Sequence, residues 1–192
     1  MELNFKEIVS VTLILFSVID IIGTIPVIID LRRKVGDIHA GTATFVSGGI
    51  MIAFLYIGKS ILSLFGVDVQ SFAVAGALII FLIGLEMTLG RNIFKTDPQM
   101  GSTKAVAIVP LAFPIIAGAG TMTTILSLKA QFEEVNILIG IFANLVLVYV
   151  VIRSSEWLEQ KLGPAGVGVL QKIFGVVLLA IAIKLFKKNL GL

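Results

Sequence analysis

The stretch Ile19–Ile29, "IDIIGTIPVII", lies inside the first long apolar run of this 192-residue chain. It places an acid, a glycine and a proline within seven positions, at Asp20, Gly23 and Pro26. A helix in lipid has to satisfy its backbone hydrogen bonds internally, because hydrocarbon offers no other partners. Glycine loosens a helix and proline removes one of its donors. We therefore expect the helix to be interrupted at this stretch.

The composition around this stretch is that of an integral membrane protein. Hydrophobic residues make up 57% of the chain and charged residues 14%, with a mean hydropathy of +1.07, whereas soluble domains carry about a quarter charged residues. The absence of cysteine excludes a disulfide framework, a thiolate nucleophile and a cysteine metal site. The basic residues lie at the ends of apolar runs, which indicates membrane topology and no nucleic-acid partner.

The apolar runs predict six transmembrane helices in one membrane domain, residues 1–192. Each run is long enough, or nearly so, to cross a hydrocarbon core of about 30 Å at about 1.5 Å per residue. The first run is longer than a signal-peptide core and ends at Arg32-Arg33-Lys34, so we keep it as a span. The expected spans lie near residues 9–30, 42–64, 70–90, 104–128, 136–153 and 169–187.

The distribution of lysine and arginine predicts the orientation in the inner (cytoplasmic) membrane. Nine of these residues fall in the first, third and fifth connections, against six on the other side, or three without the C-terminal tail. Because basic loops stay in the cytoplasm, both termini are expected outside it. The basic tail, with Lys184, Lys187 and Lys188, argues the other way.

The chain repeats itself at an offset of 97 residues. Residues 113–128 match residues 16–31 at six of sixteen positions, including Gly23 with Gly120 and Thr24 with Thr121, and the same offset relates Gly66 to Gly163. Each half of the chain, residues 1–100 and 101–192, would contain three helices. Because an odd number of spans reverses the direction in which the chain crosses the membrane, the second half would be inverted relative to the first. We therefore expect an inverted repeat of the transporter type.

Matching interruptions are expected in the first and fourth spans. Proline frees the carbonyl four residues earlier, and glycine lowers helix propensity further. Taken singly, such residues are also common in transmembrane helices, where they allow close packing. Corresponding breaks in both halves are a sequence sign of a transport site. The breaking residues are Pro26 in the first span and Pro110 and Pro114 in the fourth.

The interrupted spans predict a polar site near the membrane midplane. Helices that restart after Gly23 and Gly120 present free N–H groups, which suit a carboxylate. Asp20 either binds a substrate ammonium or coupling cation, or is a static acid bonded to freed backbone groups. Asn144, opposite Ser47 in the repeat, either lines the cavity or forms an inter-helix hydrogen bond. The expected substrate-binding residues are Asp20, Gly23, Thr24, Gly118, Gly120, Thr121 and Asn144.

Other polar residues argue against catalysis. His39 lies in a charged loop, and Glu86 lies near a helix end beside Arg91, where it is expected to extend to the interface. With no cysteine and no second mid-membrane carboxylate to pair with Asp20 as acid and base, an intramembrane enzyme is the weakest hypothesis. We expect no enzyme, no cofactor and no metal site.

Four stretches of the sequence resemble the MarC family, also described as the six-helix neutral amino acid transporter family. They are "FSVIDIIGTIPVI" (16–28), "FLIGLEMTLG" (81–90), "PLAFPIIAGAGTMTT" (110–124) and "IFGVVLLAIAI" (173–183). The family's first motif usually reads Asp-Pro-x-Gly and its fourth-helix motif Gly-Pro-Gly, whereas this chain has Ile21 and Ala119 at those prolines.

The resemblance implies transport of small neutral amino acids such as glycine or alanine, driven by a proton or sodium gradient. Together with the pattern of breaks, it favours a secondary transporter that binds a zwitterion at the midplane between broken first and fourth helices. A passive channel or an exporter for small solutes is the alternative. The lipid bilayer is the expected surrounding, and a homo-oligomer is left open.

Overall fold

The computed structural model describes residues 3–21, 23–90 and 106–190. Over these residues all regular secondary structure is helical, with no strand. The elements are α1 (Phe5–Ile19), α2 (Ile25–Val35), α3 (Ala40–Leu64), α4 (Val69–Leu89), η1 (Ala107–Ile116), α6 (Ala119–Lys129) and α7 (Glu134–Leu190). α7 bends sharply at Gly163, so it forms a first arm, Glu134–Leu158, and a second arm, Ala165–Lys187.

Four of the predicted spans are confirmed as helices long and apolar enough to cross a membrane. These are α3, α4 and the two arms of α7. The bent pair η1 and α6, with an angle of 49° between its parts, can form a fifth span. The expected run 9–30 is divided between α1 and α2, with 15 and 11 residues, each shorter than the roughly 20 residues that a span needs. Residues 104 and 105 of the fourth run lie outside the described residues.

The interruption expected in "IDIIGTIPVII" is present, and it lies before the proline. α1 ends at Ile19, and Asp20 follows in the left-handed conformation, with φ 48° and ψ 50°. The helix resumes at Ile25 after the N-cap residue Thr24. Pro26 is therefore in the first turn of α2, where a missing N–H costs nothing because it has no partner within the helix. The carbonyl of Ile22 lies outside the described residues.

The second interruption has a different backbone. Val109 and Phe113 are extended, with φ −127° and −130°, as expected for residues that precede a proline. The turns of η1 are wide, and the N–H of Ala117 donates to the carbonyl of Ala112 at 2.8 Å, five residues back. α6 restarts at Ala119, with Gly118 as its extended N-cap residue. The restart therefore comes before Gly120, and not after it as the repeat alignment predicted.

The order of elements is the same in both halves of the chain. A broken pair of helices is followed by two long ones, first as α1, α2, α3 and α4, then as η1, α6 and the two arms of α7. α2 and α6 each have 11 residues, and α3 and the first arm each have 25. The turns between the long helices contain Gly66 and Gly163, 97 positions apart, with φ 66° and 64°.

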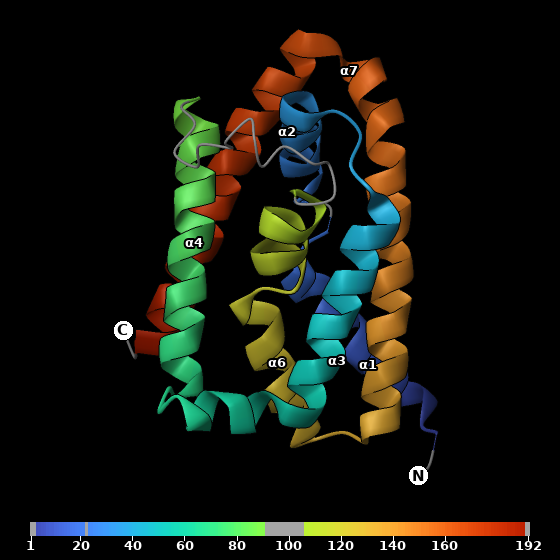
Figure 1. The fold of residues 1–192 in the computed structure, drawn as a ribbon, viewed down its shortest axis with the longest axis vertical. Coiled ribbons are helices and arrows are strands. Elements are labelled where there is room, and N and C mark those ends of the chain that lie inside the picture. The colour runs from blue at the N-terminus through green and yellow to red at the C-terminus, as the bar shows by residue number, and fades with distance from the viewer. Residues whose placement is uncertain (1–2, 22, 91–105, 191–192) are drawn as a thin grey trace.

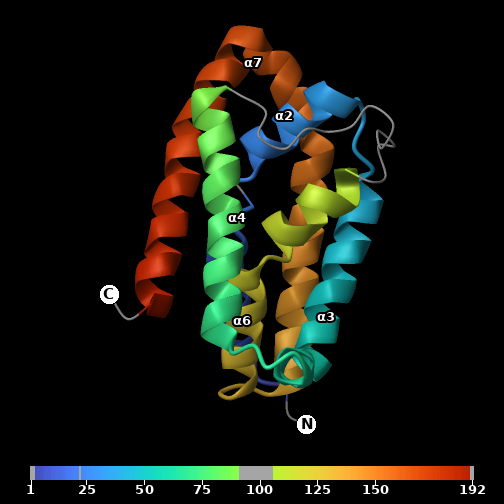
Figure 2. The same ribbon diagram turned by 60° about the vertical axis from the view of Figure 1, so that its left-hand side comes forward.

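The long helices surround the broken ones. The two arms of α7 form an inverted V, and α2 lies between them near the bend (Figure 1). α4 lies beside the second arm (Figures 1 and 2), and a Cβ built on Gly84 would be only 2.9 Å from the carbonyl oxygen of Gly175. On the other side, a Cβ on Gly48 of α3 would be 2.7 Å from Leu145 Cδ1 of the first arm. Small residues thus let the long helices approach closely, as is usual in membranes.

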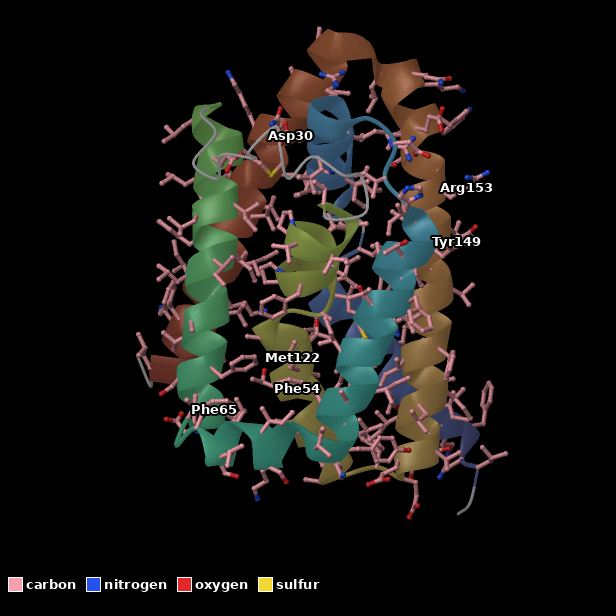
Figure 3. All side chains as sticks on the ribbon, viewed as in Figure 1. Asp30, Phe54, Phe65, Met122, Tyr149 and Arg153 are labelled. Carbon is pink, nitrogen blue, oxygen red and sulfur yellow. The ribbon has the colours of Figure 1, made fainter. Side chains whose placement is uncertain are left out.

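The outward faces of the long helices carry large apolar side chains. Val146 of the first arm is 63% exposed and Val169 of the second arm 61%. In the view with side chains, Tyr149 and Arg153 also point away from the bundle (Figure 3). A surface of this kind suits contact with lipid. The structure is therefore that of an all-helical membrane protein with four to five candidate spans, one of them broken.

Candidate functional site

A small cavity lies beside the first interruption. It has a volume of ≈ 40 Å³, and since one water needs about 10–15 Å³ it has room for about three waters. Asp20 and Thr24 are its polar side chains. The rest of the wall is aliphatic and comes from α1, α2, α4, η1 and the second arm of α7, with Val18, Ile19, Val27, Ile80, Ile83, Ile115, Leu178 and Ile181. The cavity therefore suits a ligand of a few heavy atoms with one polar end.

The backbone of the interruption fixes the position of Asp20. The N–H of Gly23 donates to Asp20 Oδ1 at 3.3 Å, and the N–H of Thr24 donates to the Asp20 carbonyl at 3.0 Å. A Cβ on Gly23 would lie 2.7 Å from Asp20 Cγ, so the carboxylate can occupy this position only when residue 23 is glycine. One carboxylate oxygen is therefore anchored, and the other, Oδ2, has no hydrogen-bond donor among the described residues.

The start of α2 forms another part of the cavity wall. Thr24 is the N-cap residue, but its hydroxyl donates to the carbonyl of Ile21 at 2.7 Å and makes no capping bond to α2. The first N–H groups of a helix have no partner within it and carry a partial positive charge. Thr24 and Val27, which line the cavity, belong to this first turn. The cavity wall therefore includes both a carboxylate and the first turn of a helix.

The predicted residues of the second interruption do not line this cavity. Thr121 is buried, and its hydroxyl donates back to the carbonyl of Ile116 at 3.0 Å. Its repeat mate Thr24 does the same across the first interruption. Gly118 lies against the carbonyl of Pro114, and a Cβ on Gly120 would be 3.8 Å from Val18 Cγ1, a cavity residue. Gly120 therefore lies beside a residue of the cavity wall without lining the cavity itself.

Asn144 lies in a contact between helices, outside the cavity wall. Its side-chain amide donates to the carbonyl of Thr12 in α1 at 3.1 Å and to that of Gly140 at 2.8 Å. Ser47 donates to the carbonyl of Ala43 in its own helix at 2.8 Å. Of the two alternatives left open for Asn144, the structure shows the inter-helix hydrogen bond.

Two features of the site had no clear signal in the sequence. Ile80 and Ile83 of α4 belong to the aliphatic wall. Because α4 is apolar on all sides, its sequence pattern does not indicate which face turns inward. Glu86, expected at the interface, is buried on the same helix with 9% of its surface exposed. Among the described residues, no group of three or more His, Asp or Glu side chains could hold a metal ion.

Comparison with known proteins identifies the family. The model of the MarC family integral membrane proteins matches residues 5–191. Among similar proteins, UPF0056 membrane protein YvbG of Bacillus subtilis is 29% identical over 193 residues, covering 93% of this chain and 92% of that protein.

Two further relatives show the same extent of similarity. A UPF0056 membrane protein of Pyrococcus abyssi is 28% identical, covering 89% of this chain and 88% of that protein. UPF0056 membrane protein YhcE of Escherichia coli is also 28% identical, with 88% and 85% covered. No solved structure matches the chain. Since the family model spans nearly all of its residues, the chain belongs to the MarC family of multi-pass integral membrane proteins.

Proposed function

We propose that this chain is a secondary active transporter of small neutral amino acids, of the size of glycine and alanine. The observation that carries the proposal is the cavity of ≈ 40 Å³ in which the Asp20 carboxylate lies beside the start of α2, within an otherwise aliphatic wall. An ionisable residue inside a membrane domain is by default a functional candidate. In this proposal the chain is a carrier and not an enzyme, and it needs no cofactor.

The two polar groups of the site match the two charges of a zwitterion. The substrate ammonium would donate to Asp20 Oδ2. The substrate carboxylate would accept from the N–H groups of Ile25 and Val27, since Pro26 has none and that of Thr24 donates to the Asp20 carbonyl. The aliphatic wall would then face the substrate side chain. Room for about three waters favours hydrogen or methyl there over a branched side chain.

The coupling ion in this proposal is a proton or sodium. An unpaired carboxylate in the membrane is costly, by about 2.5–3.5 kcal/mol on insertion scales, so Asp20 is expected to be neutralised at each step of the cycle. A substrate ammonium, a proton or a sodium ion can each do this. Coupling follows if the carrier reorients only after one of them has bound.

The proposal also includes six spans arranged as two inverted repeats, residues 1–100 and 101–192. The repeated order of elements supports it, as do the matched turns at Gly66 and Gly163. The start of α1 and the end of α7 both lie in the lower half of Figure 1, as an even number of spans requires. With both termini outside the cytoplasm, a cysteine introduced at Lys34 should be labelled only by reagents that cross the membrane.

Purified protein in liposomes tests the function. We expect saturable uptake of labelled glycine and alanine under an imposed proton or sodium gradient, and counterflow of labelled glycine when unlabelled glycine is inside. Asp20→Asn, which keeps the shape of the site, should lose both. Steady ionic current without counterflow would show a channel instead, and no glycine or alanine movement under either gradient would refute the proposal.

A further inference from the structure

Two ion pairs occupy equivalent positions in the two halves of the chain. At the end of α2, Arg32 Nη2 lies 3.2 Å from Asp37 Oδ1. At the end of α6, Lys129 Nζ lies 3.0 Å from Glu134 Oε1. Both members of the second pair lie 97 positions after their counterparts, the offset that aligns Gly23 with Gly120. The residues differ in identity but keep their charge, so a search for identical residues does not find them.

Each cation also reaches the long helix of the other half. Arg32 Nη1 lies 3.0 Å from Glu156 Oε2 in the first arm of α7. Lys129 Nζ donates to the carbonyl of Leu55 in α3 at 2.9 Å. A further link between α2 and α7 runs from Gln171 Nε2 to Asp30 Oδ1 at 2.8 Å. At its far end, each short helix therefore has a cation that contacts the other half.

These two contacts lie at opposite ends of the bundle. α2, with Asp30, lies near the bend of α7, whereas Met122 of α6 lies in the lower half of the view (Figure 3). The cavity lies at the base of α2, and both short helices are packed into the interior, with Ile28 and Ile125 fully buried. α2 lines the cavity through Val27, and α6 approaches it at Gly120, beside the cavity residue Val18, so movement of either short helix would change access to the cavity.

We infer that Arg32 and Lys129 are the two latches of the transport cycle, one for each side of the membrane, an inference that rests on the proposed transport function. The α2 latch is Arg32 with Glu156, and the α6 latch is Lys129 with the Leu55 carbonyl. Alternating access requires that each latch releases only while the other is closed. Arg32 and Lys129 act as positioning residues, because neither lines the cavity.

The two latches differ in strength. The Arg32 side chain, 11% exposed, meets the Glu156 carboxylate, which is itself 61% exposed, whereas the Lys129 side chain, 34% exposed, meets a neutral carbonyl. The contact of Arg32 with Glu156 includes the attraction between two full charges, which a contact with a neutral carbonyl lacks. The α6 latch should therefore release first, so the empty carrier opens at the α6 end, the side on which both termini lie.

A single cysteine tests the latches, since the chain has none of its own. Ile83→Cys places a thiol in the cavity wall, and an impermeant maleimide is applied to each side of oriented vesicles without substrate. We expect more labelling from the α6 side in the otherwise unchanged chain. Arg32→Gln should raise labelling from the α2 side about fivefold or more. Lys129→Gln should raise labelling from the α6 side above the level of the unchanged chain.

Matched variants separate the latches from the local ion pairs. Asp37 and Glu134 each pair with a cation of their own half, so Asp37→Asn and Glu134→Gln leave both contacts between the halves in place and should change labelling much less than the latch variants. If Arg32→Gln fails to fold, Arg32→Glu combined with Glu156→Arg and Asp37→Asn restores the pair between the halves with reversed charges and removes the like charge at position 37. This exchange should recover the original labelling, whereas Arg32→Glu alone should not.

The labelling assay tests the latches and the uptake assay tests the proposed function, so either hypothesis can be refuted without the other. Equal changes from both sides, or none, in Arg32→Gln and Lys129→Gln would overturn the latches even if glycine is transported. A lack of glycine and alanine movement in the unchanged chain would overturn the proposed function, whatever the labelling shows. Opposite, side-specific changes with recovery in the charge exchange would support the latches.

Discussion

Gly23 donates its backbone N–H to Asp20 Oδ1 at 3.3 Å, and the Asp20 carboxylate fills the space in which a side chain at position 23 would begin. Glycine is needed here because of Asp20, and not only because of a bound substrate. The carboxylate, in turn, reaches the cavity because Asp20 adopts positive φ. Aspartate and asparagine tolerate that conformation better than most residues.

Gly23→Ala should displace the Asp20 carboxylate from the cavity wall. The new Cβ would lie 2.7 Å from Asp20 Cγ, too close for the present rotamer. We expect the Kd for glycine to rise by at least about tenfold, as measured by binding to purified protein. Gly41→Ala is the control, since a Cβ there meets nothing within 4 Å. Unchanged affinity in Gly23→Ala would show that the position of the carboxylate does not matter for binding.

Asp20→Asn should separate charge from shape at the same position. Asparagine tolerates the left-handed conformation and can still accept from Gly23, so the fold should persist. A hydrogen bond to a charged group contributes about 1.5–3 kcal/mol, so affinity for glycine should fall about 10–150-fold. Normal uptake with an unchanged dependence on the cation gradient would instead favour a static, hydrogen-bonded acid.

Ile80→Ala should widen the range of substrates. Ile80 belongs to the aliphatic wall, so removing most of its side chain makes room for a larger substrate. We expect valine to compete with labelled glycine in this variant and not in the unchanged chain. Leu78→Ala, at a position 51% exposed on the same helix, should leave selectivity as it was. Identical competition profiles in all three proteins would place the selective contacts elsewhere.

Asn144→Leu should lower stability without changing the substrate site. The substitution removes the bond from the Asn144 amide to the Thr12 carbonyl, which links α7 to α1. Inter-helix hydrogen bonds in membranes contribute about 0.6 kcal/mol on average and up to about 1.7, so the free energy of unfolding should fall by that order. Ser47→Ala removes a bond within one helix and should cost less. A large loss of glycine affinity in folded Asn144→Leu would assign that residue to the site.

Asp68 should make stability depend on pH in the acid range. It caps α4, and hydrogen bonds from the hydroxyl and the N–H of Ser71, both 2.7 Å, hold the pKa of its carboxyl below the usual range. A lowered pKa in the folded state gives stability above the ordinary pKa, near 4, that is lost as pH falls through the lowered value. The melting temperature should therefore fall below about pH 4, and by less in Asp68→Asn, which caps without titrating.

The long spans could be predicted because their signal is continuous. Runs of about 20 apolar residues separated by glycine and charged residues gave α3, α4 and both arms of α7 within a few positions. The first interruption was also predicted, but its cause was assigned to Pro26. The left-handed Asp20 begins it instead, and a non-glycine residue with positive φ leaves little trace in a sequence.

The site was predicted in part, for similar physical reasons. Asp20 and Thr24 were found because a carboxylate and a hydroxyl one turn apart are unusual in an apolar run, and both line the cavity. The wall from α4 was missed because all faces of that helix are apolar. Arg32 and Lys129 were missed because the repeat preserves their charge and not their identity.

The hydrogen bonds of Asn144 to α1 and of Lys129 to α3 also constrain how the protein is made. Each broken pair packs on a long helix from the other half of the chain. During synthesis, α1 and α2 therefore enter the membrane before α7, their partner, exists. The carboxylate of Asp20 and the guanidinium of Arg32 therefore lack their neighbours from α7 until the last third of the chain is inserted. The first half gains its final structure only when translation is nearly complete.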